Sequence, residues 1–147
     1  MDENLDWEQL PRAEFAFPGP LRETLVEAIL AGRKTTTTSL LAECEQEGDY
    51  IPTAGERDVL IDSREQPVAV LENTEVRIVR LGDVDLRHVI DEGEGDKSIA
   101  SWRAKHEAFW KTPEMQAELN DPNFTIDDDT MLVLERFRII ARLNPDE

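Results

Sequence analysis

Residues 21–39 read LRETLVEAILAGRKTTTTS and contain a helix followed by the start of a strand. Leu25, Ile29 and their apolar neighbours recur at helical spacing, which predicts a helix with one apolar face. Gly32 stands where the C-terminal cap of that helix belongs. The four threonines at 35–38 favour an extended strand, because β-branched side chains fit a pleated sheet better than a helix interior. The stretch therefore predicts a helix, a reversal at glycine and a strand.

Outside this stretch, the pattern predicts short helices that are separated from runs of strands. The sequence predicts further helices over 40–47, 83–90 and 99–111, and strands over 58–62, 67–81 and 131–141. Polar Glu72 and Asn73 interrupt the long middle strand, which predicts a bulge there. Helices and strands are segregated, with few β-α-β units, so the predicted class is α+β with a mainly antiparallel sheet, open or closed into a barrel.

The length of 147 residues predicts a single domain. No repeat or linker divides the chain, so we expect residues 21–147 to form the domain and the acidic residues 1–20 to form an N-terminal arm. The net charge of −17 disfavours a broad surface for duplex nucleic acid, because such surfaces release counterions through clustered cations. A nucleoside or a short single-stranded RNA remains compatible with this charge.

The chain carries no feature of membrane insertion or secretion. No window holds 18 uninterrupted apolar residues, and the acidic beginning lacks the basic and apolar regions of a signal peptide. The single cysteine, Cys44, cannot form an internal disulfide, which fits a reducing compartment. We therefore expect a cytoplasmic protein without a membrane partner. The oligomeric state is not predicted.

Lys34 is the first candidate for chemistry. A lysine after a helix C-terminus has a structural explanation, since cations are stabilised at the negative end of the helix dipole. The functional alternative needs a Lys34 sheltered from water, whose amine would act as a base toward Thr37, three residues further on. The residues alone leave both interpretations open.

The acidic loop at 91–98, with sequence DEGEGDKS, is the second candidate. It has a structural explanation as a solvated loop whose Ser98 caps the next helix. The functional alternative is a carboxylate that faces Lys34. Its spacing matches no EF-hand calcium loop and no paired histidines support zinc, so neither a metal nor another cofactor is predicted.

The aromatic and histidine side chains have mainly structural explanations. Trp102 and Trp110 are predicted core residues, with base stacking as the alternative. His106 shares their helix face and is predicted to pack there. His88 and Cys44 lie in no motif that indicates chemistry.

Six short motifs, taken together and in this order, resemble the ASCH family of the PUA-like superfamily. They are Gly32-Arg33-Lys34-Thr35, Thr38-Ser39-Leu40, Glu45-Gln46-Glu47-Gly48, Asp91-Glu92-Gly93-Glu94-Gly95-Asp96-Lys97-Ser98, Trp102-Arg103 with His106, and Val133-Leu134-Glu135-Arg136-Phe137. They span about residues 22 to 141. The resemblance implies a PUA-like fold, a mainly antiparallel β-barrel flanked by helices, with a cleft for a nucleobase, nucleoside or RNA beside the Gly-x-Lys-Thr turn.

The resemblance also implies catalytic roles. Some relatives look like amidohydrolases that remove an acyl group from the exocyclic amine of cytidine. Carried over, Lys34 is the general base, Thr37 the nucleophile and Glu92 the acidic partner. The longer loop of this chain leaves the choice between Glu92 and Glu94 open.

Two other activities are compatible with the same cleft. Relatives that resemble ribonucleases suggest cleavage of single-stranded RNA, with Lys34 and Ser98 as the matching cleft residues. In this hypothesis Lys34, Arg103 and Lys97 contact the phosphate, and Ser98 forms a hydrogen bond nearby. A module that binds a nucleotide without catalysis is the third hypothesis. The residues expected to contact the substrate are Arg33, Thr38, Ser98, Trp102 and Arg103.

Overall fold

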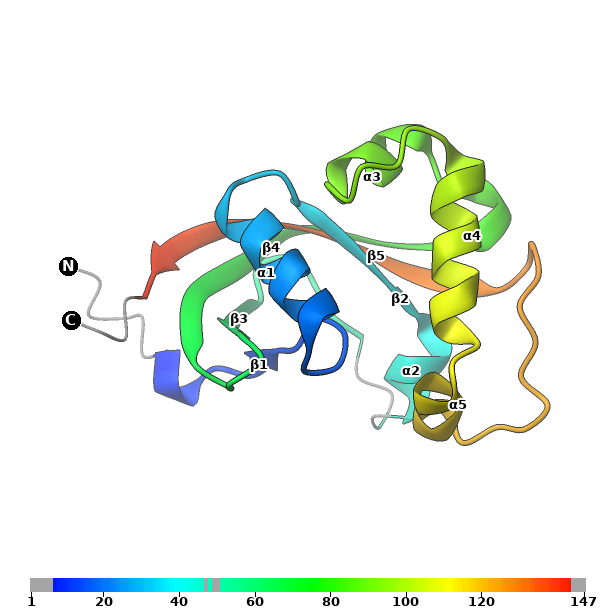
Figure 1. Ribbon diagram of the computed structural model, residues 1–147, viewed down its shortest axis with the longest axis horizontal. Coiled ribbons are helices and arrows are strands. Elements are labelled where there is room, and N and C mark those ends of the chain that lie inside the picture. Colours follow the sequence, from blue (N-terminus) through cyan, green and yellow to red (C-terminus); the bar gives the residue numbers. More distant parts are fainter. Residues whose placement is uncertain (1–6, 47, 49–50, 144–147) are drawn as a thin grey trace.

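The computed structural model describes residues 7–46, 48 and 51–143, and its strands form one five-stranded sheet in the order β1-β3-β4-β5-β2 (Figure 1). The strands are β1 (Arg12–Ala13), β2 (Thr36–Leu40), β3 (Arg57–Ile61), β4 (Pro67–Arg80) and β5 (Met131–Arg142). All pairings are antiparallel except β1 with β3, which is parallel. The predicted α+β class with a mainly antiparallel sheet is confirmed. Residues 1–6 of the predicted arm and Glu47 lie outside the described residues.

The helices follow the predicted order along the chain. They are α1 (Pro20–Leu30), α2 (Leu41–Gln46), α3 (Leu86–Asp91), α4 (Ile99–Trp110) and α5 (Pro113–Leu119), with 3-10 turns η1 (Trp7–Gln9) and η2 (Leu81–Asp83). Gly32 has a φ of 81°, in the left-handed region that glycine adopts without steric cost, and it ends α1 as predicted. No helix in the described part of the chain combines the length and apolarity that a bilayer crossing requires.

The predicted closure of the sheet into a barrel is wrong. Closure requires the two outermost strands to pair, but β1 has only two residues and bonds to β3 alone. At the other edge, the outer side of β2 is covered by side chains: the Lys34 ammonium donates a hydrogen bond to the Thr36 carbonyl at 2.9 Å. The sheet therefore stays open, with both edges short or covered.

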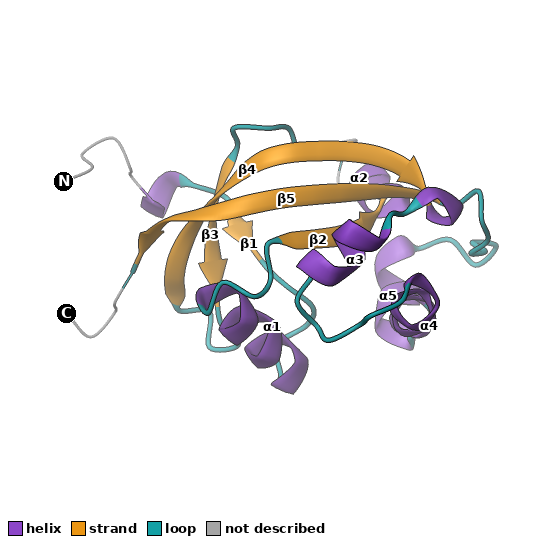
Figure 2. Ribbon diagram, turned by 90° about the horizontal axis from the view of Figure 1, so that it is seen from above, coloured by secondary structure: helices purple, strands orange, loops and turns teal. Residues whose placement is uncertain are grey.

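The β4–β5 pair forms a long ribbon that bends where the sequence predicts a bulge. The pairing register shifts between Asn73 and Glu75, so Thr74 has no partner on β5. A second shift lies between Val70 and Leu71. Figure 2 shows the curved ribbon passing over α1 at one end and over α3, α4 and α5 at the other.

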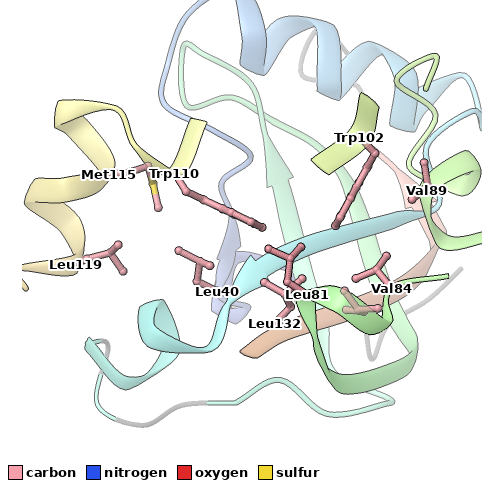
Figure 3. Close-up of a cluster of buried hydrophobic side chains, with 10 residues drawn as sticks. Leu40, Leu81, Val84, Val89, Trp102, Trp110, Met115, Leu119 and Leu132 are labelled. Atoms are coloured by element: carbon pink, nitrogen blue, oxygen red, sulfur yellow. The ribbon is translucent and has the colours of Figure 1, made fainter. Parts of the chain in front are cut away.

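Two hydrophobic clusters attach the helices to this ribbon. The larger one joins α4, α5, η2 and the end of β5, and Figure 3 shows its side chains converging. Its buried members are Leu40, Leu81, Val84, Val89, Trp102, Trp110, Met115, Leu119, Leu132 and Leu134. The smaller one joins α1 to the other end of the ribbon through Val26, Ile29, Leu60, Ala69, Leu71 and Phe137.

Residues 7–20 pack against the domain. Phe15 meets Phe137 edge-on, with ring centroids 6.0 Å apart. Arg22, which is 1% exposed, donates from Nε to the Phe15 carbonyl and from Nη2 to the Ala16 carbonyl. A buried guanidinium thus fixes the chain that leads into α1, because its donors replace water at two loop carbonyls.

Candidate functional site around Lys34

Lys34 is buried, although it lies between α1 and the edge strand β2. The residue is 2% exposed, and its Nζ lies 3.3 Å from Glu94 Oε2 and 3.9 Å from Glu92 Oε1. The Thr36 carbonyl is its third partner, at 2.9 Å. A buried ammonium requires such partners, because an uncompensated charge in the interior is costly. The predicted meeting of Lys34 with the acidic loop is present in the structure.

The loop reaches Lys34 because its backbone docks on the turn after α1. The Thr35 amide donates to the Asp91 carbonyl at 2.8 Å. Gly93 adopts a φ of 69°, and a β-carbon there would lie 2.2 Å from the Arg33 carbonyl oxygen. Only glycine permits this approach, which places the acidic loop directly against a turn about 60 residues earlier in the chain.

Glu92 is the centre of the polar network. It is 1% exposed and accepts a hydrogen bond from the Thr38 hydroxyl. His88 Nε2 lies 3.2 Å from its Oε2, and His106 Nε2 lies 3.2 Å from its Oε1. Burial opposes ionisation, but the hydrogen bonds from His106 and His88 and the charge of Lys34 outweigh it and hold the pKa of Glu92 well below its usual value. Glu92 is therefore a carboxylate.

His106 donates from both ring nitrogens. Its Nδ1 lies 2.9 Å from the Trp102 carbonyl oxygen, and its Nε2 faces Glu92. Burial alone would lower the pKa of His106. The hydrogen bond to Glu92 and the charge of Glu92 raise this pKa by more than burial lowers it, so the net shift is upward. An imidazolium matches this arrangement, since two acceptors face the two nitrogens. The residue packs on Trp102 at 4.3 Å between ring centroids, as predicted, and also carries charge.

Glu94 is the closer carboxylate to Lys34 and differs from Glu92 in the direction in which its pKa is shifted. Burial raises the pKa of Glu94, and the neighbouring Glu92 adds to this rise against the opposing charge of Lys34. Glu92, Glu94 and His106 also place ligand atoms within 4.8 Å of one another, a set that fits a divalent metal. In this structure the Lys34 ammonium lies against both carboxylates and the His106 ring lies against Glu92.

Thr37 lies on the other face of β2 from this network. The Thr36 hydroxyl donates to the His88 carbonyl oxygen at 3.0 Å, and the Thr38 hydroxyl oxygen lies 2.7 Å from the His88 ring Nε2. Alternation along the strand places Thr37 on the opposite face. Within the described residues, Thr37 Oγ1 makes no hydrogen bond to Lys34 or Glu92.

The face of Thr37 carries its own buried carboxyl. Glu135 pairs directly with Thr37 across the strands and accepts a hydrogen bond from Asn73 Nδ2 at 3.0 Å. Burial raises the pKa of Glu135, and the nearby charges of Asp58 and Glu56 add to the effect. Burial together with Glu56 also raises the pKa of Asp58 to about 6. Thr37 therefore faces a carboxyl that binds a proton more readily than usual.

The other residues predicted to contact substrate are engaged in structural roles or lie outside the network. Ser98 caps α4, accepting from the Ser101 amide. Trp102 is fully buried in the larger cluster, and its Nε1 has no hydrogen-bond partner among the described residues. Arg103 pairs with Glu107 at 2.7 Å and Asp128 at 2.5 Å. Arg33 is exposed, 3.8 Å from Glu27.

Sequence reasoning missed the histidines and the second carboxyl face. His88 and Glu92 stand four residues apart on α3, and this spacing is a signal in the sequence that they share a helix face. No comparable signal joins Glu135 to Asn73, because their contact depends on the register of β4 with β5.

The family model and one of the solved structures name the same family. The family model of the ASCH domain matches residues 14–141. A search of curated proteins returned no match. The chain is similar to the solved structure of an ASCH domain from Lactobacillus crispatus JV V101, with 27% identity, a TM-score of 0.77, and coverage of 90% of this chain and 80% of the other.

Two further solved structures resemble this one. Protein EF3133 of Enterococcus faecalis V583, described under the family model DUF984, has 28% identity and a TM-score of 0.70, with 81% of this chain and 68% of that chain covered. The hypothetical protein PH0355 shares the fold at 15% identity and a TM-score of 0.54, over 80% of this chain and 93% of its own. The family model covers most of the chain, and on that basis the protein belongs to the ASCH domain family.

Proposed function

We propose that this ASCH domain is an amidohydrolase that removes an acyl group from the exocyclic amine of a cytidine-type nucleoside. The observation that supports the proposal is the buried Lys34 ammonium, held between Glu92 and Glu94 at the start of the threonine strand. Buried titratable groups with strongly shifted proton affinities cluster at active sites more than elsewhere. A neutral nucleoside also feels little repulsion from a protein of net charge −17.

In the proposed reaction, Glu94 first takes a proton from Lys34. Burial raises the pKa of Glu94, which makes it a better proton acceptor than an ordinary glutamate. The freed Lys34 amine then accepts a proton from a water molecule as the water oxygen attacks the acyl carbon. The carbon–nitrogen bond breaks, and Lys34 returns the proton to the leaving amine. The acid is released with the water oxygen on its carbonyl carbon, and no covalent bond to the protein is formed. Thr37, the nucleophile expected from the resemblance, faces away from Lys34 and has no role in this step.

Glu92 has a positioning role in this scheme. Glu92 stays ionised, and its contacts fix the side chains of His88, His106 and Thr38 next to Lys34. It therefore holds Lys34 at the edge of β2 without exchanging a proton itself.

The test is incubation of the purified protein with N4-acetylcytidine, with cytidine release followed by chromatography. Lys34→Met should lower kcat/KM by at least about 100-fold, which matches the loss of a general base. Thr37→Val should leave kcat/KM close to that of the original protein, because Thr37 lies on the other face of β2. Lys111→Met, an exposed substitution on α4's end, is the control. Activity that survives Lys34→Met in a folded variant overturns the mechanism.

A second set of variants identifies the group that receives the proton. Glu94→Gln should lower kcat and remove the acidic limb of the pH profile, since an amide accepts no proton. Glu135→Gln should leave that limb in place. The opposite result would assign the base to the carboxyl that lies across from Thr37.

A further inference from the structure

Three arginines line a depression of about 340 Å³ on the sheet beside α3. They come from three elements, and the lining consists of Glu75 and Arg77 of β4, Asp85 and Arg87 at α3, and Arg136 of β5. Every lining residue is charged. In a protein with twice as many acidic as basic residues, 33 against 16, such a grouping of guanidiniums is unexpected from composition.

Neighbouring carboxylates orient these arginines. Arg77 Nη2 lies 2.9 Å from Asp85 Oδ1, and Arg136 Nη2 lies 2.9 Å from Asp91 Oδ2. Arg77 Nε also lies 3.6 Å from Glu75 Oε1, and Arg87 Nε lies 3.6 Å from Asp91 Oδ2. A guanidinium has five N–H donors in a fixed plane, and these ion pairs involve one or two nitrogens of each arginine. The donors outside these pairs keep a fixed orientation, which suits the oxygens of a phosphate.

The depression adjoins the Lys34 site across α3. Arg87 and Asp91 stand four residues apart on one stripe of the helix, while His88 and Glu92 form the next stripe. Arg136 pairs in register with Thr36, the residue whose carbonyl holds Lys34. One short helix thus separates the arginines from the proposed catalytic network.

We propose that this arginine depression binds a phosphate group of the substrate, so that the substrate is a nucleotide or a single-stranded RNA rather than a free nucleoside. The assignment of this phosphate to the substrate rests on the proposed deacylation at Lys34. The phosphate site itself rests on the arginine geometry alone.

The charge balance predicts how such a site behaves. Glu75, Asp85 and Asp91 offset the three guanidiniums, so long-range attraction contributes little. Affinity then comes from directed hydrogen bonds, which distinguish a phosphate from other anions by its geometry. Binding should still weaken with salt, by a slope of about −0.7 in log K against log salt for each contacted phosphate of a single strand.

The experiment measures binding of an eight-nucleotide single-stranded RNA by fluorescence anisotropy at two salt concentrations. Arg87→Gln with Arg136→Gln should weaken binding at least about tenfold and flatten the salt slope. Arg87→Gln alone removes a side chain that is 83% exposed, so it tests the site without a risk to folding. Arg64→Gln, in the exposed turn between β3 and β4, is the matched control. Affinities within twofold of the original protein would overturn the proposal.

Asp85→Asn gives the reciprocal test. The Asp85 side chain caps α3 by accepting from the His88 amide, and asparagine caps helices equally well. The change removes one negative charge from the depression and should tighten RNA binding by a few fold. Weaker binding in a variant of unchanged stability would contradict a phosphate at this place.

Two further comparisons complete the experiment. The first shows whether the phosphate belongs to a mononucleotide or to RNA, and the second shows whether the phosphate site and the proposed deacylation stand or fail independently. If a mononucleotide is the ligand, acetylated cytidine 5′-monophosphate should have a lower KM than the nucleoside, and the double arginine variant should abolish that difference. If only the oligonucleotide responds to the arginines, the phosphate belongs to RNA. Arginine-dependent binding without any deacylation sustains the phosphate site and rejects the proposed function. If deacylation occurs but the arginine substitutions change neither RNA binding nor the KM of the mononucleotide, the proposed function is sustained and the phosphate site is rejected.

Discussion

At the residue scale, Gly93 decides whether the acidic loop can meet Lys34. Alanine there would place a β-carbon 2.2 Å from the Arg33 carbonyl and would also strain a φ of 69°. We expect Gly93→Ala to lower the free energy of unfolding by about 3 kcal/mol or more, because backbone must move on both sides. Urea denaturation measures this change.

Gly95→Ala is the control for this prediction. Gly95 has a similar φ of 89°, but a β-carbon there would meet nothing within 4 Å. Only the conformational strain remains, which costs about 1 kcal/mol. Equal losses at the two positions would show that the close approach at Gly93 is unimportant.

Glu92 gives the second prediction at this scale. Glu92→Gln leaves His106 without its carboxylate and the buried Lys34 with Glu94 alone, and it should cost about 2 to 4 kcal/mol at pH 7. Because the pKa of Glu92 is lower in the folded state than the ordinary 4.5, its stabilisation is present above that value and is lost as the pH falls through the folded pKa. The difference between the two proteins, measured by urea titration, should therefore shrink in acid. A difference that stays constant from pH 7 to pH 3 would contradict the ionised assignment.

The sequence predicts individual residues of the site unevenly. The meeting of Lys34 with the acidic loop followed from the resemblance to a family, since composition alone left the lysine explained by the helix dipole. The pKa values of the loop's two carboxyls shift in opposite directions, because His88 and His106 reach Glu92 but not Glu94. That division depends on three-dimensional packing of α3 against α4, which periodicity does not encode.

At the element scale, Ser98 tests whether a predicted cleft residue has a structural role only. Its hydroxyl accepts from the Ser101 amide and so satisfies a free donor at the start of α4. Ser98→Ala should lower stability by about 1 kcal/mol, and Ser98→Thr should restore most of it. Thermal unfolding followed by circular dichroism measures the effect. A weaker substrate affinity with unchanged stability would instead identify a ligand contact.

The elements themselves were predicted well where a period extends over several turns or pleats. The predicted helices at 21–31 and 99–111 and the predicted strand at 131–141 agree with α1, α4 and β5 to within about a residue. The bulge near Asn73 was also predictable, because two polar residues interrupt an apolar strand. Whether the sheet closes was not predictable from the sequence. The outcome depends on whether the outermost strands β1 and β2 pair with each other, which periodicity within one segment does not show.

At the scale of the whole molecule, Asp58 and Glu135 on the Thr37 face should make the free energy of unfolding depend on pH. The direction of this dependence is opposite to that expected from Glu92. Burial raises the pKa of Asp58 from 3.8 to about 6, so the folded state binds a proton more tightly than the unfolded chain. Stability therefore falls as the pH rises from about 4 to 6 and levels off above that. Asp58→Asn should remove this fall and stabilise the protein at pH 7 by about 1 to 2 kcal/mol, a figure reduced for solvent screening of a partly exposed group.

The measurement for Asp58 is the free energy of unfolding in urea at unit steps between pH 4 and pH 8. Glu135, whose pKa is also raised by burial, contributes in the same direction and remains in the variant. The variant should thus keep a shallower slope of the same sign. Parallel curves for the two proteins would show that Asp58 ionises normally in the folded state.

The bent β4–β5 ribbon contributes side chains to both hydrophobic clusters, so the two clusters should unfold cooperatively. Leu132 and Leu134 of β5 enter the larger cluster and Phe137 enters the smaller one, so neither cluster can melt without loosening a strand that the other needs. Although the helices sit in two groups, denaturation should proceed as a single all-or-none transition. Fluorescence from Trp102 and Trp110 should report the same midpoint as far-ultraviolet circular dichroism, even though both indoles belong to one end of the molecule.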